Sequence, residues 1–81
     1  MPRRAFYRYE EGRLSPYSVD YPPPVYYTVH EQQAMADLWH VMEQDHIPIA
    51  FEDGQAAQQF ADDHARATKW RTCIREVDNK R

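Results

Sequence analysis

The stretch IPIAFEDGQAAQQFADDHARA, residues 47–67, decides how the fold is built. Its first five residues alternate larger apolar side chains with others, which is the pattern of a half-buried strand. Asp53 then predicts a helix N-cap, because its carboxylate can accept from free backbone N–H groups and suits the positive end of the helix dipole. His64 shares the apolar face of this helix. We expect it at the edge of the core over Phe60 rather than in a metal site, since no second ligand shares its face.

The next stretch, KWRTCIREV at residues 69–77, alternates in the same way and predicts a second strand. A strand, a helix and a strand of this length predict a right-handed crossover, with strands 47–52 and 69–77 parallel in one sheet. With the apolar side chains turned toward the helix, the opposite face of the sheet is open. We expect that open face, close to Tyr7 and Tyr9, to show polar or small residues: Ala50, Glu52, Arg71, Cys73 and Arg75.

A second helix is predicted just before this unit. Residues 25–28, VYYT, predict a short strand, after which Thr28 and Glu31 have the spacing of a capping box. Pro48 restricts the residue before it, so this helix is expected to end near residues 45–46. Its buried stripe would consist of four residues at helical spacing: Met35, Leu38, Trp39 and Met42.

The N-terminal part of the chain predicts a β-hairpin. The stretch RAFYRYEEGRLSPYSV, residues 4–19, alternates aromatic residues with arginine around Glu11 and Gly12. Pro16 has no N–H to donate, so we expect the second arm to lie at a sheet edge or to be irregular. DYPPPV, residues 20–25, predicts a stiff extended connector, and a ligand for a proline-reading domain is the alternative.

These elements predict one small α+β domain, or a small α/β domain. We expect a curved mixed sheet of four to five strands with two helices packed on one face. The expected division is an aromatic and basic hairpin at 1–20, a proline-rich connector at 21–24, a β-α-β-α-β core at 25–77 and a polar tail at 78–81. At 81 residues the chain has room for one core and little stability to spare.

The sequence offers little catalytic chemistry, so we expect no enzyme, no cofactor and no metal site. Cys73 is the single cysteine, which excludes an internal disulfide and a cysteine zinc site. Two glycines are too few for a glycine-rich phosphate loop. No signal-peptide h-region or membrane-spanning run is present, and we expect a cytoplasmic protein. Asp37, His40 and Glu43 lie on one broad side of the predicted second helix. We expect this side to be a solvated polar face rather than a divalent-cation site, because the three residues are widely spread around the helix.

Charge is strongly segregated along the chain. No lysine or arginine occurs between Arg13 and Arg66, and nine carboxylates lie in that interval. Residues 1–13 have a net charge of plus two and residues 66–81 a net charge of plus four, although the net charge of the whole chain is minus three. The pattern indicates either simple solvation of the surface or a bipolar surface with a charged partner.

These features predict a small non-catalytic protein-interaction module that binds a larger protein or complex. We expect an inhibitor or adaptor of phage or mobile-element type, docking through acidic helices or through an aromatic sheet face. The expected partner-binding residues are aromatic, basic or acidic: Tyr7, Arg8, Tyr9, Glu43, Asp45, Asp62, Asp63, Trp70, Arg71 and Arg75. The sequence leaves open whether two copies pair through the hairpin edge.

The alternative is a single-stranded nucleic-acid binder. Tyr7, Tyr9 and Trp70 would stack on bases while nearby arginines contact phosphates. The net negative charge of the chain disfavours this alternative, because attraction to phosphate usually needs a basic domain.

Overall fold

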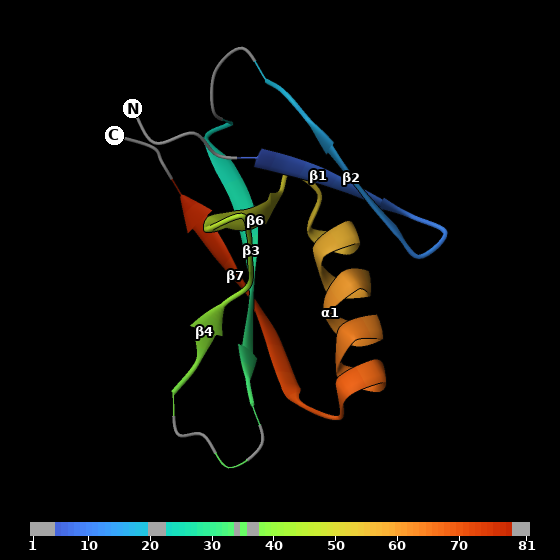
Figure 1. Ribbon diagram of the computed structural model, residues 1–81. Coiled ribbons are helices and arrows are strands. Elements are labelled where there is room, and N and C mark those ends of the chain that lie inside the picture. Colours follow the sequence, from blue (N-terminus) through green and yellow to red (C-terminus); the bar gives the residue numbers. More distant parts are fainter. Residues whose placement is uncertain (1–4, 20–22, 34, 36–37, 79–81) are drawn as a thin grey trace.

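A computed structural model describes residues 5–19, 23–33, 35 and 38–78, which form a mixed sheet and one helix (Figure 1). The elements in chain order are β1 (Ala5–Glu10), β2 (Arg13–Tyr17), β3 (Val25–Gln32), β4 (His40–Val41), β5 (Glu43–Gln44), β6 (Ile47–Phe51), α1 (Gly54–Thr68) and β7 (Arg71–Asp78). The predicted α+β class with a mixed sheet is confirmed. The expected two helices and four to five strands are wrong, since the described chain has one helix and seven strands.

The strand–helix–strand unit is present as predicted, with one strand inserted. β6 and β7 each pair antiparallel with β3, so the two are parallel to one another on either side of it. Asp53 caps α1 by accepting from the Gln55 backbone N–H at 2.9 Å. The helix ends at Lys69, which is left-handed and donates its N–H to the Ala65 carbonyl at 2.8 Å. The local signals in residues 47–77 therefore identify these elements correctly.

The helix predicted to begin at Thr28 is wrong. β3 continues through this position, and all its residues from Val25 to Gln32 pair with β7. Thr28 is buried in the middle of the strand, where its hydroxyl lies 3.0 Å from the His30 ring. The run of aromatic and β-branched residues in VYYTVH suits a strand, and the long pairing with β7 outweighs the local capping signal.

The core occupies both faces of the sheet. On the side of α1 a buried cluster joins strand residues to two helix alanines: Tyr7, Val29, Ile49, Phe51, Ala57 and Ala61. On the other side Phe6, Tyr26 and Ala50 are buried together beneath Tyr17, Val19 and Val77. The expectation that Ala50 shows on an open face is therefore wrong, and only the part of that face along β7 stays open.

Two tight turns have left-handed backbone at both central residues, as the type I′ form of a two-residue hairpin turn requires. The predicted turn between β1 and β2 is confirmed, with φ of 50° at Glu11 and 75° at Gly12. A second turn joins β5 to β6, with φ of 55° at Asp45 and 65° at His46. This second hairpin was not predicted, because residues 43–46 were expected to belong to a helix and its end.

The β5–β6 turn can be made more stable by substitution, because left-handed backbone costs least for glycine and asparagine. Replacing Asp45→Asn together with His46→Gly should raise the free energy of unfolding by about 1 kcal/mol. Urea unfolding followed by circular dichroism measures this gain. The matched control is Glu43→Gln, an exposed change beside the turn, which should leave the midpoint unchanged. A double variant no more stable than the control would contradict the turn geometry.

Candidate partner-binding surfaces

Tyr7 and Tyr9, expected beside the open sheet face, instead support the core under α1. Tyr7 is 6% exposed, and its ring centre lies 6.4 Å from that of Phe51. Tyr9 packs edge-on against Phe60 at 5.4 Å, and its hydroxyl donates to the Asp63 carboxylate at 2.5 Å. These two tyrosines hold the hairpin against the helix and present no aromatic surface beside the arginines of β7.

Trp70 is separated from the open face as well. It lies in the turn between α1 and β7, where its ring meets His64 edge-on at 6.3 Å. His64 stacks on Phe60, as expected, and its Nε2 lies 2.8 Å from a Glu31 carboxylate oxygen. Glu31 thus joins β3 to α1 instead of completing a capping box.

Arg71 and Arg75 do share the sheet face opposite α1. Ile74 packs in the α1-side core and the Thr72 hydroxyl donates to the Ala61 carbonyl at 3.1 Å, so the alternate residues of β7 point away from the helix. His30 lies opposite Cys73 in the register on this face. Burial, with the charge of Arg75 as the second cause, lowers the pKa of His30 below its ordinary value.

The four acidic residues expected at the interface lie on two different elements. Glu43 and Asp45 are exposed at the β5–β6 turn. Asp62, on α1, accepts a hydrogen bond from Gln58 at 2.9 Å. Asp63 accepts from Tyr9 and lies 3.4 Å from Arg66. These acids therefore do not form one continuous site, and Asp63 already has two partners within the chain.

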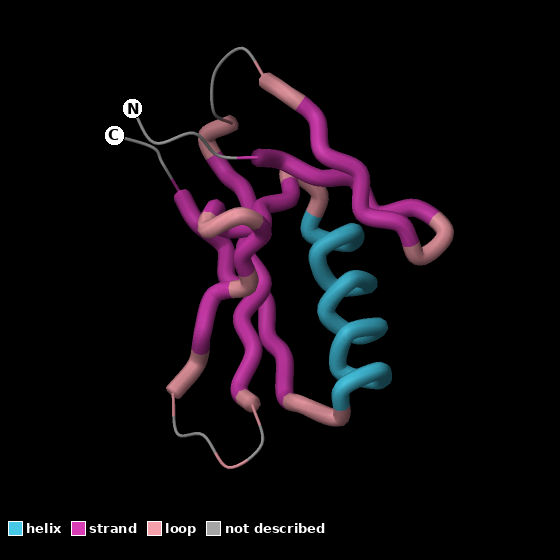
Figure 2. Tube along the Cα trace, in the orientation of Figure 1, coloured by secondary structure: helices cyan, strands magenta, loops and turns pink. Residues whose placement is uncertain are grey.

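The largest exposed apolar side chains lie between β3 and β4, in a place that sequence reasoning missed. Met35 is fully exposed, Leu38 is 69% exposed and Trp39 is 45% exposed. We call these three residues the apolar tip. They were expected to form the buried stripe of a helix, and of that predicted stripe only Met42 packs against the core. β3 and β4 carry the apolar tip toward the end of the molecule where α1 also ends (Figure 2).

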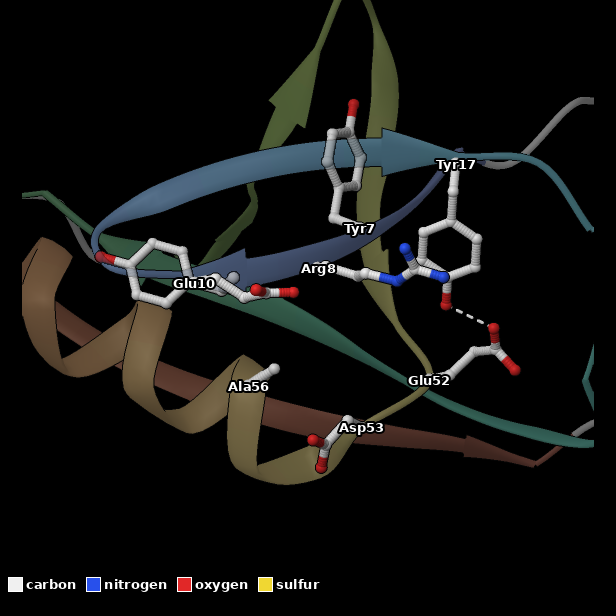
Figure 3. Close-up of a pocket in the computed structure, with 8 residues that line it drawn as sticks. Tyr7, Arg8, Glu10, Tyr17, Glu52, Asp53 and Ala56 are labelled. Atoms are coloured by element: carbon white, nitrogen blue, oxygen red, sulfur yellow. Dashed lines mark hydrogen bonds between the residues drawn. The ribbon is translucent and has the colours of Figure 1, made fainter.

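A surface pocket of about 320 Å³ lies between the β1–β2 hairpin and the start of α1 (Figure 3). Its charged lining residues are Arg8, Glu10, Glu52 and Asp53. The Tyr17 hydroxyl donates to Glu52, and the Arg8 guanidinium lies 4.8 Å from the centre of the Tyr17 ring. Asp53 is occupied as the helix cap. The contact of Tyr17 with Glu52 ties the β1–β2 hairpin to the residue that follows β6, at the side of this pocket.

The Tyr17 contact predicts a loss of stability in alkali. Burial, together with the hydrogen bond to Glu52, raises the pKa of Tyr17 to about 12. An unfolded tyrosine releases its proton near pH 10, so between these values the unfolded state binds fewer protons and stability falls as pH rises. Urea midpoints should therefore be constant just below pH 10 and decrease above it. Tyr17→Phe should reduce this slope, and an unchanged slope would contradict the contact.

No family model, curated protein or solved structure matches this chain. Within the part of the chain that the structure describes, no helix is long and apolar enough to cross a membrane. The same described residues contain no group of three or more histidine, cysteine, aspartate or glutamate side chains placed to hold a metal ion.

Proposed function

We propose that this protein is a small protein-interaction module that docks on a larger protein through the apolar tip. The exposure of Met35, Leu38 and Trp39 carries the proposal. Scattered single apolar residues are normal on a surface, but three large ones close together in sequence, at one end of the fold, mark an interaction site. Tryptophan and methionine are also enriched in the buried centres of protein interfaces.

The stem of the apolar tip supports this role. β3 is paired along its whole length with β7, and its last residues also pair with β4 through His30–Val41 and Glu31–His40. The Met42 N–H donates to the Val29 carbonyl at 2.8 Å, which fixes β4 to the core strand. A stem held in this way limits the conformational freedom that docking must remove, and this favours affinity.

Nucleic-acid binding is the second candidate, favoured by the two exposed arginines on the β7 face. Its weakness is the location of the aromatic residues. Tyr7 and Tyr9 pack beneath α1, and Trp70 packs on His64, so none forms a stacking surface beside Arg71 and Arg75. The net charge of minus three also opposes attraction to phosphate.

The test is a triple substitution at the apolar tip: Met35→Ser, Leu38→Ser and Trp39→Ser. We expect nuclease-treated lysate of the source organism to yield a near-stoichiometric protein partner with the original chain. The triple variant should weaken that binding by about 100-fold or more, since central aromatic and apolar contacts dominate interface energies. Its circular dichroism and unfolding midpoint should be unchanged, because the three side chains contribute little to the core.

The matched control carries three exposed changes on α1: Gln55→Ser, Gln59→Ser and Ala67→Ser. It should bind the partner as the original chain does. The proposal fails if the tip variant retains full binding. It also fails if only nucleic acid is recovered from untreated lysate and nuclease removes every partner.

A further inference from the structure

β7 forms one edge of the sheet. All its residues, from Arg71 to Asp78, pair with β3 on one side, in an unbroken register. No strand of the described residues pairs with its other side. From residue 71 to residue 77 its outer edge therefore carries backbone N–H and C=O groups that can serve as a template for another strand.

The two long edges of the sheet differ in their protection. β2, at the opposite edge, contains Pro16, which cannot donate to an added strand. β7 contains neither proline nor glycine and has no bulge in its pairing with β3. Of the two edges, β7 is therefore the one built to accept a regular strand.

The side chains of β7 define the charge of a fitting partner. Arg71 and Arg75 are exposed on the face opposite α1, about 13 Å apart along the strand. Within the described part of the chain, neither arginine has a carboxylate at ion-pair distance. Cys73 lies between them on the same face. An added strand would thus meet two unneutralised positive charges spaced four residues apart.

A second copy of the chain does not satisfy these charges. In a two-fold antiparallel pair, residues on the same face lie opposite one another. If the two-fold axis passes beside Cys73, Arg71 of one copy lies opposite Arg75 of the other. If it passes beside residue 75, the two copies of Arg75 lie opposite one another. If the axis passes beside Ile74, the arginines of one copy are diagonal cross-strand neighbours of the arginines of the other. Each register brings like charges together, which destabilises the pairing.

We propose that β7 accepts an extended acidic segment of the partner as an added antiparallel strand, with carboxylates opposite Arg71 and Arg75. Backbone hydrogen bonds would give affinity and the two ion pairs would set the register. This inference rests on the proposed function and adds a second surface to the apolar tip. The two surfaces are separate but lie toward the same end of the sheet, since Gln32, where β3 ends before the tip, pairs with Arg71.

The probe is a fluorescent eight-residue peptide of alternating valine and threonine that carries glutamates at two positions four residues apart. We expect it to bind the full chain, measured by fluorescence anisotropy at low salt. Arg71→Glu with Arg75→Glu should weaken binding at least tenfold. The matched charge control is Arg13→Glu with Arg66→Glu, two exposed positions, which makes the same change in net charge away from β7 and should have a much smaller effect.

Three further arms separate strand addition from other modes. A peptide with lysines in place of the glutamates, and a peptide with N-methylated backbone amides, should both lose binding. The inference is overturned if the acidic peptide does not bind, or if the N-methylated peptide binds equally well. It is also overturned if a single-stranded oligonucleotide displaces the peptide at the same site with higher affinity.

The triple tip variant distinguishes this inference from the proposed function. It should bind the acidic peptide as tightly as the original chain does, because the tip and the β7 edge are separate surfaces. Loss of peptide binding in the tip variant would overturn strand addition at β7. If a partner is captured through the apolar tip but the acidic peptide does not bind, the proposed interaction module is retained and strand addition at β7 is rejected.

Discussion

Val29→Asp is expected to prevent the domain from folding. Val29 is fully buried, lies opposite Ile74 in the β3–β7 register and packs in the core beneath α1. An unpaired carboxylate there costs several kcal/mol. A domain of this size is stable by roughly 4–12 kcal/mol, so one such group removes most of the folding free energy.

In the helix predicted from the capping box, the same substitution would instead be expected to raise the free energy of unfolding. There residue 29 would be in the first helical turn, where an aspartate is favourable. Circular dichroism and urea unfolding of Val29→Asp therefore decide between the two conformations. Gln33→Asp, an exposed change just after β3, is the matched control and should fold normally. A Val29→Asp variant as stable as the original chain would contradict β3.

Phe51→Ala is expected to lower the free energy of unfolding by about 3–5 kcal/mol. Phe51 ends β6 and is fully buried, with its ring centre 5.6 Å from Phe60 of α1 and 6.4 Å from Tyr7 of β1. Its removal leaves a cavity where the helix, the hairpin and the sheet meet. At this cost the urea midpoint should fall far below that of the original chain.

The size of the loss is measured by urea unfolding, with a conservative variant as reference. Phe51→Leu keeps most of the apolar volume and should lose clearly less stability than the alanine variant. Phe60→Ala, at a half-buried position of the same cluster, should fall between the two. Equal and small losses in all three variants would contradict the placement of Phe51 at the centre of the core.

The elements that sequence predicts correctly are those specified by their neighbours in the chain. Asp53 caps α1 within two residues of itself, and the Glu11–Gly12 turn joins strands that are adjacent in sequence. The alternation in residues 47–51 and 71–77 likewise depends only on nearby residues. These parts of the fold require no knowledge of distant pairing.

The second helix was mispredicted because its signals serve contacts that are distant in sequence. Glu31 has the capping-box spacing from Thr28, yet it binds His64, which lies 33 residues further along the chain. The strand conformation of β3 depends on pairing with β7, whose residues lie 39 to 53 positions further along the chain than their partners in β3. Local propensity cannot report such pairing, and it decides the outcome here.

The exposure of the apolar tip was missed for a related reason. Met35, Leu38 and Trp39 are apolar and helically spaced, which are also the properties of a buried stripe. Only the extent of the β3–β7 and β3–β4 pairing shows that these side chains lie outside the core. Similarly, alternation identifies Tyr7 and Tyr9 as hairpin residues, whereas their packing beneath α1 depends on the three-dimensional arrangement of β1, β6 and the helix.

Site-specific crosslinking shows whether a partner protein docks on the apolar tip. Leu38 is replaced by the photo-crosslinking residue p-benzoylphenylalanine in the source organism, and the same residue is placed at Gln59 on the exposed side of α1. We expect one predominant crosslinked protein from position 38 and none of that product from position 59. Crosslinking of the partner from position 59 but not from position 38 would contradict docking through the apolar tip.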